Sequence, residues 1–203
     1  MQDFGLVVIG AHTGIYLKDL IAKFHNKNIL LVEPVPYNYE LLQSDYKHNS
    51  NILICKNAIL DKSKKDFFYY VKKNSISKLG KHWASQIGSF DKKHILNHKN
   101  KRFDIKNDDI DIIEVQFITF EDLVYKYSIG SIHRLQLDVE GAEFKIMNSI
   151  DFQKNKINEI LFESKHFDGT FTEGKKLQLI KEKLILNGYK LKQIDKENIL
   201  ARK

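Results

Sequence analysis

Short hydrophobic runs alternate with amphipathic stretches along the first third of the chain. Leu6–Ile9, Ile29–Val32 and Ile52–Cys55 are aliphatic runs of the length expected for strands buried on both faces of a parallel sheet. Between them, apolar residues at helical spacing predict a helix over Ile15–His25 and another from Pro36 to about Tyr46. This alternation predicts a doubly wound α/β fold with right-handed crossovers.

The same alternation returns in the second half of the chain. The predicted elements, in chain order, are an edge strand Phe67–Val71, a strand Val115–Ile118, a helix near Phe120–Tyr127, a strand Ile132–Leu137, a helix ending at Ser149, a strand Ile157–Phe162, and a helix carrying Leu177, Ile180 and Leu184 that ends at Gly188. Tyr189–Ile194 and Asn198–Arg202 flank a polar turn and predict a terminal hairpin. We expect one domain over residues 1–203.

Residues 72–111 interrupt this alternation of predicted strands and helices. Lysine, asparagine, histidine and aspartate dominate the segment, and its apolar residues are scattered without a period. A loop this long inside a compact domain is usually a functional lid or a disordered insertion, and its aromatic residues favour a lid. Trp83 and Phe90 are candidates for stacking against a substrate, and equally for anchors that fasten the insertion to the core.

Composition narrows the class of protein. No apolar run approaches the ~20 residues of a membrane span, and the first residues lack the pattern of a secretory signal. Cys55 is the only cysteine, which agrees with a reducing, cytoplasmic location. The net charge of +7 comes almost entirely from lysine. Because arginine is the preferred side chain for phosphate and base contacts, its scarcity argues against a nucleic-acid partner.

The ends of the first two predicted strands carry candidate chemistry. Gly10, Ala11, His12 and Gly14 form a turn that lets the backbone approach a ligand at the start of the next helix. Glu33 ends the second strand, where a carboxylate can accept hydrogen bonds from both hydroxyls of a ribose. These residues predict an adenosine-containing cofactor.

Two carboxylates follow the strand Ile132–Leu137. Asp138 ends this strand, which lies beside the first strand in a doubly wound sheet, at the point where ligands bind. Asp138 and Glu140 could receive a ligand's ammonium group, orient an acceptor hydroxyl or bind a divalent ion. The sequence assigns too few ligands at defined spacing for an ion, so no metal site is predicted. Glu143 is expected to complement the following helix N-terminus.

Later strand ends supply further candidates. Asn57 and Ala58 follow the third strand and could border an adenine ring, although asparagine is also a common turn residue. His166 lies shortly after the strand Ile157–Phe162 and is a candidate general base, or else an exposed loop histidine. Glu163 is the second candidate base.

Together these segments resemble the FkbM family of S-adenosylmethionine-dependent methyltransferases, a branch of the class I methyltransferase fold. The resemblance runs from Val7 to about Gly188. It is carried by Ile9–Gly14, Glu33-Pro34, Asn57-Ala58, Trp83–Asp91, Leu135–Glu143 and Phe162-Glu163 with His166. The segment Asp138–Glu143, Asp-Val-Glu-Gly-Ala-Glu, is the most specific of these.

The resemblance implies a fold, a cofactor and a reaction. The fold is a Rossmann-like, three-layer α/β/α arrangement with a seven-stranded, mostly parallel sheet whose last hairpin is antiparallel. The reaction is methyl transfer from S-adenosylmethionine to a hydroxyl of a small molecule, sugar or glycan. The implied cofactor-binding residues are Gly10, Ala11, His12, Gly14, Glu33, Pro34, Asn57, Ala58, Asp138 and Glu140. Asp138, His166 and Glu163 are the candidate catalytic residues.

One position departs from the family's pattern. The first strand normally ends in an acidic residue two positions before the first glycine, and here that residue is Val8. The change implies weaker cofactor binding, a substitute such as His12 or Asp138, or a domain that has lost activity. Two alternatives to O-methylation therefore stay open: a nucleic-acid methyltransferase, suggested by the basic charge, and a non-catalytic binding module.

Overall fold

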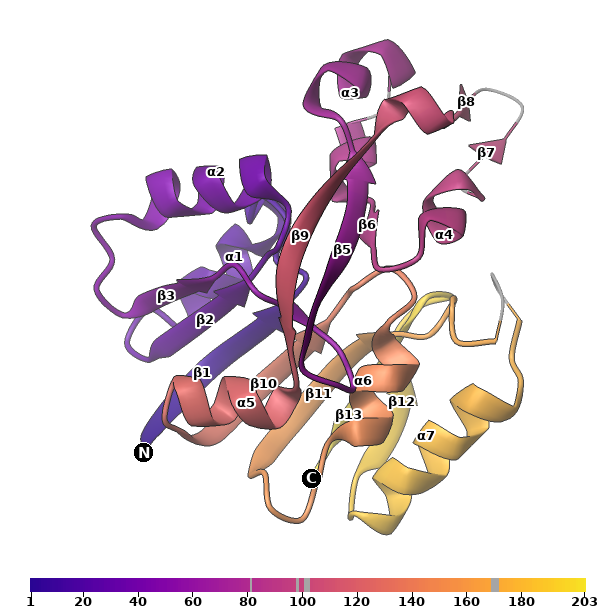
Figure 1. Cartoon of the computed structure of the whole chain (residues 1–203). Helices are drawn as coiled ribbons and strands as arrows, with labels where there is room; N and C mark the ends of the chain where they lie inside the picture. Colours follow the sequence, from indigo (N-terminus) through magenta and orange to yellow (C-terminus); the bar gives the residue numbers. More distant parts are fainter. Residues whose placement is uncertain (81, 98, 101–102, 169–171) are drawn as a thin grey trace.

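The structure is a computed structural model that describes residues 1–80, 82–97, 99–100, 103–168 and 172–203, with the backbone alone at residues 82, 83, 99, 100 and 103. Its main sheet has seven strands in the order β12-β13-β11-β10-β1-β2-β3 (Figure 1). The strands are β1 (Gln2–Ile9), β2 (Asn28–Val32), β3 (Ile52–Cys55), β10 (Ile129–Leu137), β11 (Ile157–Glu163), β12 (Lys190–Gln193) and β13 (Asn198–Arg202).

Strand directions confirm the predicted doubly wound topology. β1 pairs in parallel with both β2 and β10, β2 with β3, and β10 with β11. β13 runs antiparallel to β11 and to β12, so the terminal hairpin is antiparallel as expected. The chain leaves β1 toward β2 and β3 on one side and later returns to β10 on the other side. The switch point of the sheet therefore lies between β1 and β10.

Helices cover both faces of this sheet and give three layers. They are α1 (Lys18–Lys23), α2 (Pro36–Tyr46), α5 (Phe120–Lys126), α6 (Glu143–Ser149) and α7 (Lys175–Leu186). The single helix predicted over Ile15–His25 is shorter than expected, because a 3₁₀ turn, η1 (Ile15–Leu17), precedes α1. No helix in the described part of the chain is long and apolar enough to span a membrane.

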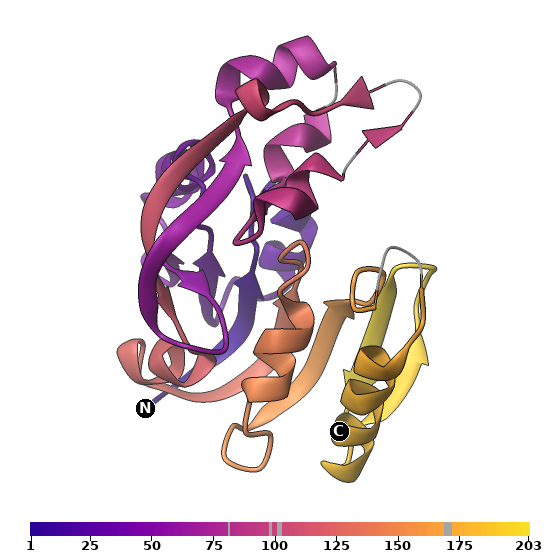
Figure 2. The same cartoon turned by 45° about the vertical axis from the view of Figure 1, so that its right-hand side comes forward.

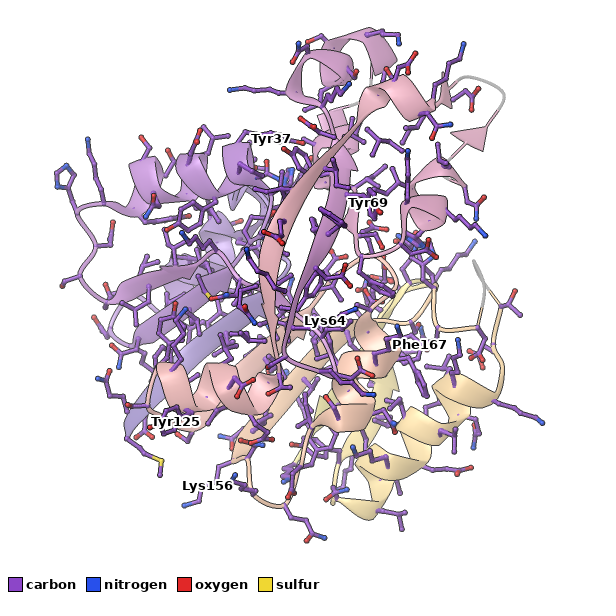
Figure 3. All side chains as sticks on the ribbon, viewed as in Figure 1. Tyr37, Lys64, Tyr69, Tyr125, Lys156 and Phe167 are labelled. Carbon is purple, nitrogen blue, oxygen red and sulfur yellow. The ribbon has the colours of Figure 1, made fainter. Side chains whose placement is uncertain are left out.

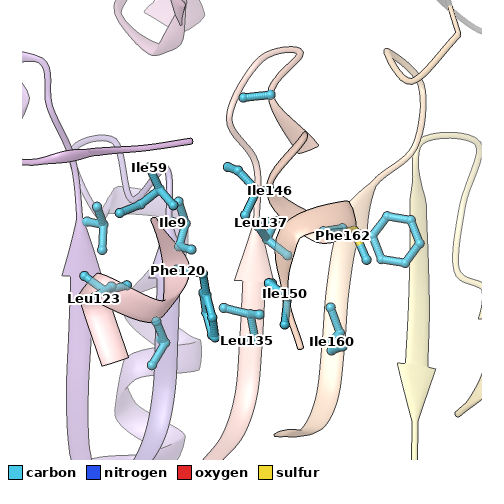
Figure 4. Close-up of a cluster of buried hydrophobic side chains, with 14 of the residues drawn as sticks. Ile9, Ile59, Phe120, Leu123, Leu135, Leu137, Ile146, Ile150, Ile160 and Phe162 are labelled. Atoms are coloured by element: carbon cyan, nitrogen blue, oxygen red, sulfur yellow. The ribbon is translucent and has the colours of Figure 1, made fainter. Parts of the chain in front are cut away.

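Alternate residues of β1 face opposite helical layers. Leu6 and Val8 pack in a cluster with residues of α1 and α2, whereas Val7 and Ile9 belong to the larger cluster under α5 and α6. Figure 4 shows the larger cluster, to which β1, β4, α5, β10, α6 and β11 contribute. Burying a large aliphatic or aromatic side chain stabilises the fold by about 1.5–3 kcal/mol. The continuous hydrophobic runs of the sequence reflect this burial on both faces.

A second sheet of four strands lies against the first. Its order is β4-β9-β5-β6, with β4 (Ala58–Ile59), β5 (Lys64–Val71), β6 (Gly88–Ser89) and β9 (Ile110–Ile118). The prediction that Phe67–Val71 is an edge strand of the main sheet is wrong, because β5 pairs antiparallel with β9 along its whole length. Phe68 is buried and Phe67 is half exposed, which is the alternation of a ribbon covered on one face.

The segment between β5 and β9 is folded, not an irregular loop. It contains α3 (Lys73–Leu79), η2 (His82–Gln86), β6, α4 (Lys92–Leu96), β7 (Lys99–Asn100), β8 (Phe103–Asp104) and η3 (Asn107–Asp109). Its scattered apolar residues close a small core of Val71, Ala84, Ile87, Ile95, Ile105 and Ile110. These elements lie together at the end of the molecule opposite both chain termini (Figures 1 and 2).

Contacts from α2 fasten this insertion to the main domain. The Tyr37 hydroxyl donates a hydrogen bond of 2.8 Å to the carbonyl of Val71 at the end of β5. Figure 3 shows Tyr37 between α2 and the β5–β9 ribbon. The amide of Asn38, which is buried, donates to the carbonyl of Ser85 in η2. The insertion is thus held where the carboxyl ends of β1, β2 and β10 meet.

Candidate functional site

The candidate site is a hollow at the switch point of the main sheet. Gly10 after β1, Glu33 after β2 and Asp138 after β10 all line it. Its apolar wall comes from Ile9, Val32, Val35, Ile59, Phe68, Phe117, Val139 and Ala142. The space between protein atoms is about 520 Å³, part of it open to solvent. We call this the first hollow.

A second hollow adjoins the first. The two share Gly10, Glu33, Gln86, Asp138 and Glu140. The second hollow adds residues of the loop after β1, which include Ala11, His12, Gly14 and Tyr16. Gly10, Glu33 and Asp138, which follow β1, β2 and β10, therefore line both hollows, whereas the candidate bases Glu163 and His166 line neither.

Gly10 brings two strand-end loops into contact. Its backbone has φ +89°, and a Cβ atom there would lie 1.8 Å from the carbonyl oxygen of Asp138. Sequence reasoning assigned this glycine to the approach of a ligand, but the structure shows that the approaching group is protein backbone. A Cβ at Gly14 would lie 2.8 Å from Leu42 of α2, so this second glycine also serves packing.

Glu33 is a buried carboxylate, 5% exposed, that organises the loops around it. Its two oxygens accept hydrogen bonds from the backbone N–H groups of His12, at 2.8 Å, and Val35, at 2.9 Å. Burial raises the pKa of Glu33 to about 7, although these hydrogen bonds act in the opposite direction. Each carboxylate oxygen keeps a second lone pair, so Glu33 can still accept a ribose hydroxyl.

The loop after β10 is held by Glu143, the first residue of α6. Glu143 is buried, and its oxygens accept hydrogen bonds from the N–H groups of Val139, at 2.8 Å, and Gly141, at 2.9 Å. Burial raises the pKa of Glu143 to about 7. Glu140 adopts φ +53°, which is uncommon for a residue other than glycine. Glu143 thereby fixes the carbonyls and side chains of this loop.

Asp138 points into the open part of the site. Its side chain is accessible to solvent because the hollows are open, although protein atoms surround it on most sides. Reduced hydration, and then the charge of Glu140, raise the pKa of Asp138 to about 6. A carboxylate with this pKa can take up a proton near neutral pH.

The two other candidate bases are buried. Glu163 pairs with Lys165 at 2.5 Å, and Lys165 also contacts Glu197 at 3.2 Å. Burial, and then the carboxylates of Asp138 and Glu140, raise the pKa of Glu163 to about 9 against the pull of Lys165. Burial opposes the charge of Lys165, but its bond to Glu163 outweighs burial and raises the pKa of this lysine.

His166 is not the exposed loop histidine that the sequence left open. Only 6% of its side chain is exposed, and its Nε2 lies 3.6 Å from Glu140 Oε2 and 3.9 Å from Glu163 Oε2. His94 of α4 joins this group: its Nε2 lies 3.3 Å from Glu140 Oε2, and its ring meets that of His166 edge-on at 5.0 Å. Sequence reasoning missed His94 because it lies in the insertion, where no period or motif marks it.

The insertion also contacts the loop after β1. His12 Nε2 and Ser85 Oγ share a hydrogen bond of 2.8 Å. Phe90, a predicted substrate contact, lines the first hollow with Lys145 Nζ 4.2 Å from its ring centre. The side chain of Trp83, the other predicted contact, lies outside the described residues. Phe68, Phe117, Gln86 and Gly88 also line the hollow, and sequence reasoning missed them.

The remaining candidates lie on the β2–β3 side of the first hollow. Pro34 and Ala58 line its wall. Asn57 lines it too, but its amide already donates to the Gln116 carbonyl at 2.9 Å and accepts from Lys126 Nζ at 2.7 Å. The Asn57 side chain is therefore engaged in holding β9.

Solved structures to which this chain is similar include several methyltransferases. A precorrin-6y C5,15-methyltransferase from Geobacter metallireducens is 11% identical, with 100% of this chain and 82% of the other covered and a TM-score of 0.48. The fibrillarin of Aeropyrum pernix, solved with bound S-adenosyl-L-methionine, is 10% identical over 99% of this chain and 66% of its own, with a TM-score of 0.45. The N-methyltransferase NodS from Bradyrhizobium japonicum is 10% identical over 99% and 84%, with a TM-score of 0.42.

No curated protein matches the chain. The protein-family model of the methyltransferase FkbM domain, in contrast, matches residues 9–191, which run from the last residue of β1 to β12 and include β10, the insertion and every candidate site residue. The chain belongs to the FkbM family of methyltransferases, and its cofactor is S-adenosylmethionine.

Proposed function

We propose that this methyltransferase is an O-methyltransferase that acts on a hydroxyl of a small molecule, sugar or glycan. The observation that carries the proposal is the position of Asp138, an accessible carboxylate with a raised pKa where the two hollows join. An alcohol must lose its proton during or just after methyl transfer. A nearby base of suitable pKa helps this step by about 10²–10⁴-fold.

Residues of both hollows fit the cofactor. Glu33 would accept the ribose hydroxyls, since the His12 and Val35 amides already hold its oxygens in place. Phe68 and Phe117, together with Ala58 and the half-buried Asn57, would border the adenine ring in the apolar part of the first hollow. The rest of the cofactor pocket would be formed by backbone atoms and wall residues of Gly10, Ala11, Gly14 and Pro34. S-adenosylmethionine supplies an electrophilic methyl group on a positively charged sulfur.

Val8 does not line either hollow among the described residues. It is fully buried in the cluster with α1 and α2. Asp138 and Glu140 line both hollows, so these carboxylates would supply the negative charge that the family's usual acidic residue provides. The positive charges of the sulfonium and of the amino group would be stabilised by such nearby carboxylates.

The proposed reaction is an in-line displacement. Bound S-adenosylmethionine would supply the methyl group to the acceptor oxygen, and the electron pair of its carbon–sulfur bond would stay on sulfur. Asp138 takes the proton of the acceptor hydroxyl, because it is accessible from the hollow, whereas Glu163 and His166 are buried. Those two residues would position the acceptor side of the site. Correct positioning alone can lower the barrier by up to roughly 7–11 kcal/mol.

We propose the insertion over residues 72–111 as the lid of this site. Gln86, Gly88 and Phe90 line the first hollow, and Ser85 bonds His12 of the loop after β1. Phe90 would face an apolar or sugar ring of the acceptor. The carboxylates of Asp138 and Glu140, which line both hollows, would repel a polyphosphate, and this favours a neutral or glycan acceptor over a nucleic acid.

The test is a transfer assay with methyl-labelled S-adenosylmethionine against sugars, glycans, small alcohols and RNA. We expect label in an O-methyl ether of a non-nucleic-acid acceptor, identified by mass spectrometry and by the carbon chemical shift of the methyl group. Label on nitrogen, on carbon or in RNA would contradict the proposed acceptor class. Calorimetry with the cofactor, run in parallel, tests whether the chain binds it at all.

A further inference from the structure

We propose that His94, Glu140 and His166 form a binding site for one divalent metal ion of the zinc type. The three residues come from α4, from the loop after β10 and from the loop after β11, so only the tertiary structure brings them together. Their ligand atoms all lie within 4.8 Å of one another. Two imidazole nitrogens and one carboxylate oxygen are a ligand set that suits zinc and its neighbours in the transition series.

Two of the three ligand separations fit a tetrahedral ion, and the third, between the two histidines, is at most 4.8 Å. Ligands about 2.0–2.2 Å from zinc at tetrahedral angles are about 3.3–3.6 Å apart. His94 Nε2 and His166 Nε2 lie 3.3 Å and 3.6 Å from Glu140 Oε2. Magnesium, in contrast, prefers oxygen ligands at about 2.0–2.1 Å in octahedral geometry. The site therefore matches a borderline-soft cation better than a hard one.

The surroundings also suit a cation. The side chains of His94, Glu140 and His166 are 19%, 15% and 6% exposed, so an ion there would be largely shielded from water. Glu163 Oε2 lies 3.9 Å from His166 Nε2 and has no hydrogen-bond partner among the described residues. Glu163 Oε2 thus faces the ring of His166, and the carboxylate of Asp138, within 4.8 Å of that of Glu163, adds negative charge near the three ligands.

A second carboxylate group is the weaker candidate. Asp138, Glu143 and Glu163 also lie close enough to share an ion. Both oxygens of Glu143, however, accept hydrogen bonds from backbone amides, and Glu163 is paired with Lys165. In the His94–Glu140–His166 group, by contrast, the carboxylate oxygen Glu140 Oε2 already faces the other two proposed ligands, His94 Nε2 and His166 Nε2.

The metal site would act on the acceptor. Three protein ligands leave the fourth tetrahedral position open, and Glu140 lines both hollows. A hydroxyl bound at that position loses its proton more readily, because a bound ion lowers the pKa of an attached oxygen. This role rests on the proposed O-methylation; binding of the ion does not. Asp138 would then receive the proton.

The experiment is a titration of chelator-treated, full-length protein with Zn²⁺ and Co²⁺, in the absence of cofactor and acceptor. We expect one ion per chain by calorimetry, and visible Co²⁺ absorption bands typical of tetrahedral coordination. His94→Ala and Glu140→Gln should each weaken binding at least about tenfold and change the Co²⁺ spectrum. Circular dichroism shows whether each variant is folded, and Glu140→Gln keeps the side-chain shape.

The matched control is His133→Ala. His133 is a half-buried histidine that packs on Phe24, away from the proposed ligands. The His133→Ala protein should therefore bind Zn²⁺ with the affinity of the unchanged protein. Equal affinity in folded His94→Ala, Glu140→Gln and unchanged protein would overturn the metal site. Because the titration contains no cofactor, that result would leave the transfer assay as an independent test of O-methylation.

Discussion

The α-carbon of Gly10 lies so close to Asp138 that a methyl group on it would sit 1.8 Å from the Asp138 carbonyl oxygen. This contact joins the loops after β1 and β10, the two adjacent parallel strands between which the strand order of the sheet reverses. It also fixes where the Asp138 side chain projects into the hollows. The position of the proposed base is thus set by the absence of a side chain on the neighbouring strand.

Gly10→Ala tests this contact. We expect it to lower the free energy of unfolding by at least about 3 kcal/mol, because a positive φ and a collision with backbone act together. Gly80→Ala is the matched control: Gly80 also has positive φ, at +64°, but a Cβ there meets no atom within 4 Å. It should cost about 1–2 kcal/mol, from the left-handed conformation alone. Equal losses in urea denaturation would show that the Asp138 contact is unimportant.

Asp138→Asn tests the proposed proton acceptor. The amide keeps the shape of the side chain but cannot take up the acceptor proton, so methyl transfer should fall at least about 10²-fold. The melting temperature should change little, since the side chain is accessible. Asp45→Asn, an exposed change on α2, serves as the control and should be fully active. Unreduced turnover in a folded Asp138→Asn protein would remove this residue from the mechanism.

Glu33 predicts a pH dependence of stability. Its folded pKa of about 7 lies above the value of 4.5 expected in the unfolded chain, so the unfolded state releases its proton first as pH rises. The contribution of Glu33 to the free energy of unfolding is fully present below about pH 4.5 and is lost as pH rises through 7. A shift of this size corresponds to about 3 kcal/mol.

The variant Glu33→Gln removes this pH-dependent contribution. We therefore expect the free energy of unfolding of the unchanged protein, relative to that of Glu33→Gln, to fall as pH rises from 4.5 to 7. Guanidinium titrations at several pH values measure this slope, which does not depend on the constant cost of losing a hydrogen bond. A difference that is flat with pH, or that rises across this window, would contradict the raised pKa.

Ser85→Ala tests whether the insertion supports the cofactor site. The substitution removes the hydroxyl that bonds His12, whose backbone amide in turn bonds Glu33. One neutral hydrogen bond contributes about 1 kcal/mol, so cofactor affinity should fall about fivefold in calorimetry. Ser77→Ala, at an exposed position of α3, should leave the affinity unchanged. An equal affinity for both variants would show that the insertion does not set the His12 loop.

Local patterns predicted most of the main sheet. The short hydrophobic runs became β1, β2, β3, β10 and β11, and Pro36 begins α2 as expected. Gly188 follows α7 with φ +84°, as predicted for a glycine that ends a helix. These predictions succeed because burial on one or both faces leaves a period in neighbouring residues. Glu33 and Asp138 could be found in the same way, since each directly follows such a run.

The fold of the insertion could not be predicted, because burial there leaves no period in neighbouring residues. Its apolar residues Ala84, Ile87, Ile95 and Ile105 come from short turns and helices, so their burial follows no single period. β5 was recognised as a strand, yet its partner β9 begins far along the chain at Ile110. Nothing local distinguishes that antiparallel pairing from an edge position beside β3.

The sequence by itself determined the alternating elements, the parallel sheet and the acidic strand ends, because each of these depends on residues that are neighbours in the chain. Only the tertiary structure decided that Gly10 meets Asp138, that Ser85 reaches His12, and that His94 joins Glu140 and His166. Those contacts depend on how the insertion folds back over the sheet, and distances between residues so far apart in sequence follow from the packing of whole elements.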